Sequence, residues 1–420
     1  MSDGALGVGL VGCGGFAEFV LDAVAGLPGL RLAAVADPSP GRADRLGARH
    51  GVPALGSLDD LLARDDVAAV LIATPPATHA AMATAALRAG RHVFCEKPLA
   101  TTTEDASAVA HEARLAGRAL VVDHVLRYNP LLRAVRHLTE RGLLAPPRRF
   151  LFENDASDED LGPGHWFWDP AHSGGIFVEH GVHFFDAART LLGSDPLSVR
   201  ATAVGRPGGP VDMVSADVVH PGGVLASHLH SFTHAHRAER QLMRLDHGFA
   251  ETRISGWIPV HGEITAWADE TDAQAWEELP SLQHDLLAVE GFRPHGGERI
   301  TVHVERNAGP AAPARGRGEE RTVPHRVTAV LDLGGEANKP YVYAQSVRAA
   351  MADLVRAARE GTPPVADAVS GFAAVAVAEA ATVAAATGRE QSVLAPGAAL
   401  PGLGPDLTGY DPDLPEGARA

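Results

Sequence analysis

Near its N-terminus the chain reads Gly7-Val8-Gly9-Leu10-Val11-Gly12-Cys13-Gly14-Gly15-Phe16-Ala17. The apolar run that ends at Val11 predicts a strand, and the residues from Phe16 to Gly26 predict a helix. A glycine-rich turn between a strand and a helix is typical of dinucleotide-binding domains, because free N–H groups at the helix N-terminus hold the pyrophosphate. On its own such a turn is a weak signal, so its surroundings decide the interpretation.

Each residue of the turn has an expected task. Gly12 permits the sharp turn, Gly14 lets the backbone approach the pyrophosphate, and Ala17 lets the helix pack closely on the strand. Gly15 and Phe16 open the helix and are expected beside the phosphates. All five are predicted to contribute to cofactor binding.

An acidic residue follows the next predicted strand at the spacing that this motif requires. Asp37 lies about twenty residues beyond the turn. A carboxylate there can accept both ribose hydroxyls of NAD, and it would repel the additional phosphate of NADP. NAD is therefore the favoured cofactor, although Arg42 nearby keeps NADP possible.

Short apolar runs alternate with helical patterns up to about Asp123, which predicts an α/β fold. The expected strands are 6–11, 32–36, 67–73, 92–94 and 120–122. Strands separated by helices form a parallel sheet that is covered on both faces. We expect a Rossmann dinucleotide-binding domain over residues 1–127.

After Asn129-Pro130 the pattern changes to polar–apolar alternation, with expected strands at 199–204, 213–219, 224–232 and 326–333 and a helical segment over 174–192. This predicts an open, mainly antiparallel sheet in an α/β domain for substrate binding and oligomerisation, residues 128–365. Residues 293–324 are rich in Gly, Pro, Arg and Glu and favour a long loop or hairpin over core. Two more helices are expected at 341–359 and 366–387. Residues 366–394 are expected to pack back on the first domain, and 395–420 to form a loosely packed tail.

The composition excludes several classes of protein. Hydrophobic residues make up 45% and charged residues 21%, as in globular chains. The net charge of -16 with no basic block excludes nucleic acid as a partner. The Ala-rich segment 365–388 contains Asp367 and Glu379, so it predicts a packed helix and no membrane span. Cys13 and Cys95 form no disulfide framework, which favours a reducing, cytoplasmic location.

Further motifs follow the expected strands of the first domain and continue into the second. Together with the glycine turn and Asp37, they make the sequence similar to the Gfo/Idh/MocA oxidoreductases, which include glucose-fructose oxidoreductase and inositol dehydrogenase. The region from about Thr233 to Pro324 departs from that pattern. The motifs are Ala73-Thr74-Pro75-Pro76 with His79, Ala89 to Cys95 followed by Glu96-Lys97-Pro98, Arg127-Tyr128-Asn129-Pro130, Gly174-Gly175, and Gly181-Val182-His183-Phe184-Phe185-Asp186.

The resemblance implies roles for several of these residues. Lys97 is expected against the nicotinamide and the reacting carbinol, with Pro98 after a cis peptide. Thr74, Pro75, His79 and Glu96 are expected to contribute to the cofactor site. A position just beyond a strand's C-terminal end is where open α/β sheets bind ligands, which fits Lys97. Members of the family need no metal for hydride transfer.

Glu179, His183 and Asp186 are spaced four and three residues apart, so they are expected on one helix face. The resemblance implies that His183 is the general base or proton relay, with Lys97 holding or exchanging the same proton. Glu179 is expected to be a catalytic residue together with Lys97 and His183, although the family usually has Asp at its position. The extra methylene moves the carboxylate by about one bond length, which is expected to reshape the substrate pocket.

Three further residues are candidates for substrate contact. Trp168 is expected to stack on a sugar ring, with core packing as its alternative, whereas the two readings are balanced for Trp166. Arg127 is expected near the cofactor or substrate, with a structural ion pair as its alternative. His180 is a second imidazole between Glu179 and His183, with the helix surface as its alternative.

His228, His230, His234 and His236 have an even spacing that would place them on one face of a continuous strand. Zinc is disfavoured, because four ligands on one extended strand cannot easily form a tetrahedron. A polar sheet face or an oligomer interface is the favoured interpretation.

Together these features predict an NAD(P)-dependent oxidoreductase that oxidises a secondary alcohol of a sugar, glycoside or cyclitol, or runs the reverse reduction. Two alternatives stay open at this point. One is a lyase, glycosidase or epimerase that recycles NAD in place, and the other is a non-catalytic NAD(H)-binding regulator. The expected partners are a small-molecule substrate and further copies of the same chain, with no membrane.

Overall fold

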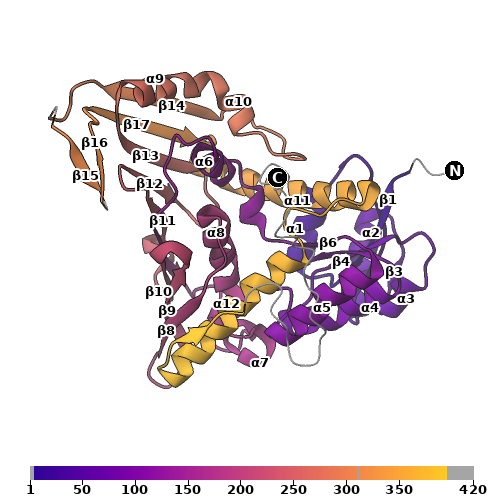
Figure 1. The fold of residues 1–420 in the computed structure, drawn as a ribbon. Coiled ribbons are helices and arrows are strands. Elements are labelled where there is room, and N and C mark those ends of the chain that lie inside the picture. Colours follow the sequence, from indigo (N-terminus) through magenta and orange to yellow (C-terminus); the bar gives the residue numbers. More distant parts are fainter. Residues whose placement is uncertain (1–3, 311, 317, 395–420) are drawn as a thin grey trace.

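The structure, a computed structural model, describes residues 4–310, 312–316 and 318–394 (Figure 1). Its N-terminal part is a six-stranded parallel sheet with strand order β3-β2-β1-β4-β5-β6. The strands are β1 (Leu6–Val11), β2 (Leu30–Ala36), β3 (Ala54–Leu55), β4 (Ala69–Ile72), β5 (His92–Cys95) and β6 (Leu120–Val122). Five of them match predicted strands to within a few residues, and β3 was not predicted.

The helices between these strands are α1 (Gly15–Ala23), α2 (Pro40–His50), α3 (Leu58–Leu62), α4 (His79–Arg88) and α5 (Thr103–Ala116). Every residue of β4 is buried, as expected for a strand that has helices on both of its faces. The predicted Rossmann arrangement is therefore confirmed, and the carboxyl ends of β1, β4, β5 and β6 meet at one edge of the sheet.

The second sheet has ten strands in the order β14-β17-β13-β12-β11-β7-β10-β9-β8-β18. Only the β7–β10 pair is parallel, so the prediction of a mainly antiparallel sheet is confirmed. The strands are β7 (Arg149–Ser157), β8 (Ser198–Gly205), β9 (Val211–His220), β10 (Val224–His234), β11 (Arg240–Asp246), β12 (Ala250–Ser255), β13 (His261–Ala268), β14 (Arg299–Glu305), β17 (His325–Asp332) and β18 (Gln391–Ser392).

The prediction that residues 293–324 stay outside the core is wrong for β14. This strand pairs with β17 at the edge of the sheet and buries Ile300. Ile300, Val302 and Val304 alternate as a strand requires, but the Gly and Pro residues on both sides obscured that pattern. The rest of the segment contains the predicted hairpin, formed by β15 (Ala314–Gly316) and β16 (Glu319–Arg321).

The helices of the second half pack on this sheet or join it to the first one. The longer ones are α6 (Pro130–Glu140), α8 (Val182–Leu192), α9 (Glu270–Glu278), α11 (Lys339–Glu360) and α12 (Ala368–Thr387). The short ones are η1 (Pro76–Thr78), η2 (Val125–Tyr128), η3 (Trp166–Trp168), α7 (Pro170–Ser173), η4 (Phe177–Gly181), η5 (Pro221–Gly223), η6 (His236–Ala238), η7 (Leu279–Leu282), α10 (Gln283–Leu286) and η8 (Glu336–Asn338).

Helix α12 crosses between the two sheets, where it contacts α5 and β6 on one side and α8 and β8 on the other (Figure 1). Its length and apolar composition would suit a membrane span, but 67% of the relevant window is buried inside the fold. The domain boundaries at residues 127, 365 and 394 stay predictions. The tail predicted over 395–420 lies outside the described residues.

Candidate active site

A cleft of about 1010 Å³ lies between the two sheets. Its lining comes from the residues that follow β1, β2, β4, β5 and β6 on one side, and from β7, β11, η3 and η4 on the other. The cleft thus opens at the carboxyl edge of the parallel sheet, where open α/β folds bind their ligands. Of the predicted site residues, it brings together Gly12, Gly14, Gly15, Phe16, Asp37, Thr74, Pro75, Glu96, Lys97, Glu179, His180 and His183.

The glycine turn has the geometry that its sequence predicts. Gly12 has a φ of +93°, and a Cβ there would lie 2.4 Å from the carbonyl oxygen of Ala73. A Cβ at Gly14 or Gly15 would meet nothing within 4 Å, so the backbone faces open space in the cleft. No side chain caps the N-terminus of α1, whose first N–H groups therefore remain available to an anion. Ala17 is buried under the turn.

Asp37 ties the glycine turn to the end of β2. Its Oδ2 accepts the N–H of Cys13 at 2.9 Å, and its Oδ1 accepts the N–H of Ser39 at 2.8 Å. Each carboxylate oxygen has a second lone pair, so Asp37 can still accept the hydroxyls of a ribose. Arg42 lines the same end of the cleft, and NADP stays compatible with the lining.

His79 supports the cleft from behind and does not line it. Its ring nitrogens lie 2.7 Å from the carbonyl oxygens of Pro98 and Thr74, and the residue is buried. It therefore joins the two loops that follow β4 and β5. The Lys97–Pro98 peptide is cis, as predicted.

Lys97 and Glu179 form an ion pair on the floor of the cleft. Lys97 Nζ lies 2.6 Å from Glu179 Oε1, and it also donates to the carbonyl oxygen of Glu179 at 2.9 Å. Both side chains are largely buried, with 15% and 14% of their surface exposed. The longer Glu arm, where the family usually has Asp, is the group that reaches the ammonium.

The predicted helix over 174–192 is not regular at this point. Residues Phe177–Gly181 form a π-turn, and the α-helix begins only at Val182. A π-turn displaces the ladder of backbone hydrogen bonds, which leaves a carbonyl free for another donor, and such turns are frequent at functional sites. Here Lys97 is that donor. Of the three residues expected on one helix face, Glu179 and His183 both line the cleft, whereas Asp186 lies outside it and pairs with Arg127.

Two imidazoles stand beside Lys97. Burial and the charge of Lys97 hold the pKa of His183 well below its usual range, and its Nδ1 has no partner among the described residues. His180 Nδ1 lies 3.0 Å from His230 Nδ1, which orients the His180 ring, and burial lowers the pKa of His180 to about 3. Both rings are thus neutral near pH 7.

Glu96 and Asp123 face each other behind Lys97. Cys95 at the end of β5 is paired with Val122 at the end of β6. Glu96 and Asp123 directly follow these two residues, so the strand register places them side by side. Burial, and then the charge of Asp123, raises the pKa of Glu96 well above its usual range. Burial raises the pKa of Asp123 to about 6. Because the pKa of Glu96 lies well above its usual range, the pair keeps a proton under conditions in which separate carboxyl groups are ionised.

Two predicted substrate contacts lie elsewhere. Trp168 does not line the cleft, because its Nε1 donates to the carbonyl oxygen of Leu161 and its ring packs edge-on against Phe232. For Trp166 the sequence favoured neither substrate contact nor core packing, and this residue does line the cleft, with 38% of its surface exposed. Arg127 forms a bidentate ion pair with Asp186, the structural alternative named for it.

The four histidines of the 228–236 region do not share a face. A register shift after Ser231 interrupts β10, and His234 and His236 lie apart near Asp155 and Glu239. His228 and His230 are buried between the sheet and the aromatic rings of α8 and η4. They therefore belong to the interior, and the interpretation as a polar sheet face or an oligomer interface is wrong for them.

Several residues of the cleft carry no sequence motif. They come from strands and helices far apart in the chain, and they are Asp123, Asn154, Glu239, Gln241, Trp257 and Tyr343. For Asp123 a signal was available, because it directly follows β6 at the carboxyl edge of the sheet, as Lys97 follows β5. The other five are placed by packing alone.

Comparison with known families matches both halves of the chain. Residues 6–124 match the model described as an oxidoreductase family with an NAD-binding Rossmann fold, and residues 132–251 match the GFO/IDH/MocA C-terminal domain.

Among curated proteins, inositol 2-dehydrogenase of Rhizobium meliloti is 34% identical over 195 residues, 46% of this chain and 57% of the relative. The scyllo-inositol 2-dehydrogenase (NAD(+)) of Bacillus subtilis is 29% identical over 42% of this chain and 50% of its own length. The 1,5-anhydro-D-fructose reductase of Ensifer adhaerens is 31% identical over 54% of this chain and 69% of its own length. The chain thus spans about half the length of the first two of these relatives.

Among solved structures, levoglucosan dehydrogenase in complex with NADH has a TM-score of 0.71 at 19% identity, and covers 93% of this chain and 100% of its own. The aldose-aldose oxidoreductase of Caulobacter crescentus has a TM-score of 0.67 at 20% identity, with 93% and 100% covered. At these identities the likeness shows the fold, and it extends over both sheets.

Proposed function

The chain belongs to the Gfo/Idh/MocA oxidoreductase family, and on that premise we propose that it is an NAD-dependent dehydrogenase acting on a secondary alcohol of a sugar, glycoside or cyclitol. The observation that carries the proposal is the placement of Lys97, Glu179 and His183 in one cleft with the glycine turn. The residues proposed to transfer the proton thus line the same cleft as the residues proposed to bind the dinucleotide.

The residues of the cleft fit NAD. The open space beside Gly14 and Gly15 and the uncapped start of α1 suit a pyrophosphate, and Asp37 suits the ribose hydroxyls. The family model for this half of the chain describes NAD binding. When bound, NAD supplies the acceptor for the hydride of the carbinol carbon.

The protein's own residues handle the proton. His183 is neutral near pH 7, because burial and the charge of Lys97 hold its pKa well below its usual range, so it can accept the proton of the substrate hydroxyl. Lys97, held by two contacts to Glu179, can donate a hydrogen bond to the oxygen on which negative charge develops. Glu179 is a positioning residue, since it acts through Lys97.

The remaining lining supports a polyhydroxylated ring as substrate. Trp166 offers an aromatic face, and Asn154, Gln241 and Glu239 offer donors and acceptors of the kind that sugar hydroxyls need. The names of the relatives point to the same class, since they include dehydrogenases of inositols and a reductase of an anhydro-sugar.

A homo-oligomer in the cytoplasm is the proposed working form. The outward face of the second sheet carries exposed apolar side chains, with Val219 and Leu225 directly paired across β9 and β10. Such a patch is suited to contact with another copy of the chain. Cys13 and Cys95 are both free thiols, which fits a reducing compartment.

The test is a substrate panel with purified protein and NAD. Myo-inositol, scyllo-inositol, levoglucosan and simple aldoses are incubated separately, and NADH absorbance is compared with product formed. A net dehydrogenase produces one NADH for each product molecule. Product without NADH would assign the protein to the redox-recycling class instead, and NAD binding without turnover on any member would favour a regulator.

A further inference from the structure

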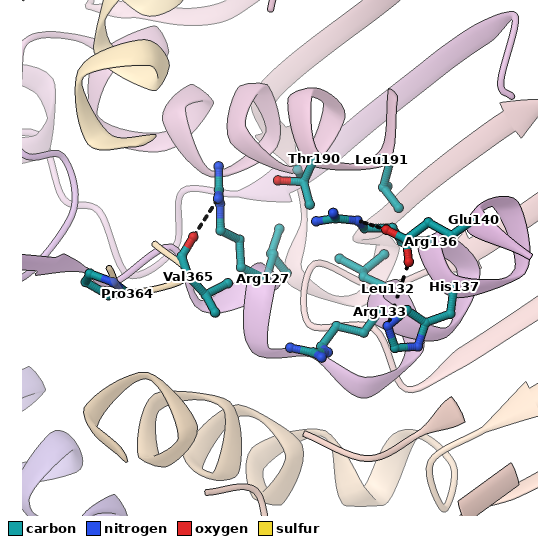
Figure 2. Close-up of a pocket in the computed structure, with 12 residues that line it drawn as sticks. Arg127, Leu132, Arg133, Arg136, His137, Glu140, Thr190, Leu191, Pro364 and Val365 are labelled. Carbon is teal, nitrogen blue, oxygen red and sulfur yellow. Dashed lines mark hydrogen bonds and ion pairs between the residues drawn. The ribbon is translucent and has the colours of Figure 1, made fainter. Parts of the chain in front are cut away.

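A second cavity lies behind the active site, and the proposed dehydrogenase does not use it. Its volume is about 530 Å³, which is within the range of small-molecule sites. Figure 2 shows it between α6, α8 and the segment that precedes α12. Three arginines and one histidine line it, with an aliphatic remainder: Arg127, Arg133, Arg136, His137, Leu126, Leu132, Ala187, Leu191, Pro364 and Val365, together with Glu140 and Thr190.

Two of the three arginines have carboxylate partners. Arg136 Nε lies 2.6 Å from Glu140 Oε1, and Arg127 donates to the carbonyl oxygen of Val365 (Figure 2). Arg127 is also paired with Asp186 at 2.7 Å. Their charges are therefore largely balanced within the fold.

The side chain of Arg133 makes no hydrogen bond or ion pair within residues 4–310, 312–316 and 318–394. Its Nε is buried without a partner, and burial followed by the charge of Arg136 lowers the pKa of its guanidinium. A partly buried guanidinium with unmade hydrogen bonds is costly in free energy. An arginine without a partner beside a cavity is placed to bind an anion there, even though the net charge of the protein is -16.

We propose that this cavity binds a small organic anion, whose oxyanion group pairs with Arg133 and whose short aliphatic body lies on Leu132, Leu191 and Val365. The hydroxyl of Thr190 and the ring of His137 are further polar groups of the same lining. An inorganic ion would leave the aliphatic part of the lining wet, so the cavity favours an anion that carries an apolar body.

The cavity is linked to the catalytic residues through Arg127. Arg127 lines the cavity and forms an ion pair with Asp186, which lies one helical turn after His183 in α8. Ala187, Thr190 and Leu191 of the same helix also line the cavity, so the cavity and the proposed base are attached to one element.

The experiment titrates the full-length protein with hexanoate in a calorimeter, with hexan-1-ol and inorganic phosphate as comparison probes. Hexanoate is expected to bind saturably, hexan-1-ol not to bind, and phosphate to bind more weakly than hexanoate. Equal affinity for phosphate and hexanoate would overturn the claim that the aliphatic lining is recognised, and no saturable binding of hexanoate would overturn the site itself.

Variants locate the binding. Arg133→Gln is expected to weaken hexanoate binding about tenfold or more, since it removes one charged hydrogen-bonding partner. Its melting temperature should equal or exceed that of the wild type, because an unpaired, partly buried cation is removed. Arg31→Gln, an exposed residue of β2, is the matched control. Equal weakening in Arg31→Gln would contradict the proposal.

One further variant separates this site from the large cleft. Lys97→Ala is expected to keep the hexanoate affinity of the wild type, because Lys97 does not line the second cavity. Loss of hexanoate binding in Lys97→Ala would place the anion in the active-site cleft and overturn the proposal. The readout is binding, so the outcome does not depend on whether the dehydrogenase assignment holds.

Discussion

Lys97 and Lys339 are the only lysines in a chain that otherwise uses arginine for its positive charges. Arginine cannot release its proton under ordinary conditions, whereas an ammonium is a compact donor that can exchange one. Lys97 is paired with Glu179 in the cleft that His183 also lines, where this difference bears on the proposed proton transfer. The role that we propose for Lys97 therefore depends on its proton chemistry as well as on its charge.

We expect Lys97→Ala to abolish turnover, a loss of about a thousandfold or more, while NAD binding stays close to that of the wild type. Lys97→Arg is expected to be nearly as inactive, because it keeps the charge but changes the geometry and the proton chemistry. Turnover is followed by NADH absorbance and NAD binding by fluorescence titration. Lys339→Ala, which changes the other lysine, should keep wild-type turnover, and undiminished turnover in Lys97→Ala would refute the assignment.

Glu96 and Asp123 make stability depend on pH in a definite direction. In the unfolded chain both carboxyl groups are ionised above about pH 4, whereas the folded pair keeps a proton, since burial raises the pKa of Asp123 to about 6 and that of Glu96 well above its usual range. Folding therefore takes up protons. The stability that the pair contributes is complete below pH 4 and is lost as the pH rises through 6 and above.

We expect Asp123→Asn to be more stable than the wild type at pH 8, by on the order of 1–3 kcal/mol, and to lose that advantage near pH 4. The amide can donate to Glu96 without any proton uptake. Melting curves at several pH values measure the difference, and the buried histidines cancel because both proteins contain them. Asp65→Asn, at an exposed position, should show the same dependence of melting temperature on pH as the wild type. If the melting temperature of Asp123→Asn also changes with pH as that of the wild type does, the pair does not hold a proton.

At the level of elements, α12 is held unusually close to the strand and loop that carry the active site. A Cβ at Gly371 would lie 2.7 Å from Val122 Cγ2 in β6 and 3.0 Å from Leu99 Cβ, two residues after Lys97. The small residue lets the helix approach, and the helix in turn supports the loop that aims Lys97. The low polarity that makes α12 resemble a membrane span serves this buried position.

Gly371→Ala is therefore expected to destabilise the protein by about 1–3 kcal/mol, although alanine normally stabilises a helix relative to glycine. Gly41→Ala in α2 is the control, because a Cβ there meets nothing within 4 Å, and it should stabilise by up to about 1 kcal/mol. Urea unfolding measures both changes. If Gly371→Ala stabilises the protein as much as Gly41→Ala does, α12 is not packed closely against Val122 and Leu99.

At the level of the whole molecule, the outward face of the second sheet exposes apolar side chains. Val219 and Leu225 are opposite one another in β9 and β10, and 37% and 38% of their surfaces are exposed. Their neighbours Val218 and Ala226 point inward and are buried, so the strands alternate as a half-covered sheet should.

Wild-type protein is expected to elute as an oligomer, and Leu225→Asp to shift it toward the monomer, because an aspartate would be buried without a partner in the interface. Light scattering after gel filtration gives the molar mass. Leu115→Asp on α5, where the leucine is 62% exposed, is the control and should leave the mass unchanged. A monomeric wild type, or equal masses for wild type and Leu225→Asp, would refute an interface on this face.

The sequence by itself determined the local features of this protein. The strands around the glycine turn, the carboxylate at Asp37 and the position of Lys97 beyond β5 follow from periodicity and spacing within short stretches, and the structure has them as predicted. Irregular strands such as β14 were missed because glycine and proline on both sides hide a short alternation.

Only the tertiary structure decided which side chains meet. Arg127 looked like a cleft residue, but Asp186 and Val365 hold it behind the cleft. Trp168 was expected in the pocket but packs inside the fold, where its indole N–H has an internal acceptor, whereas Trp166, for which both interpretations were open, lines the cleft. The π-turn at Glu179 and the pairing of Glu96 with Asp123 depend on partners up to 82 residues away. Local patterns specify which segments become strands, turns and helices. Side-chain contacts, burial and the resulting charge states depend on residues that only folding brings together.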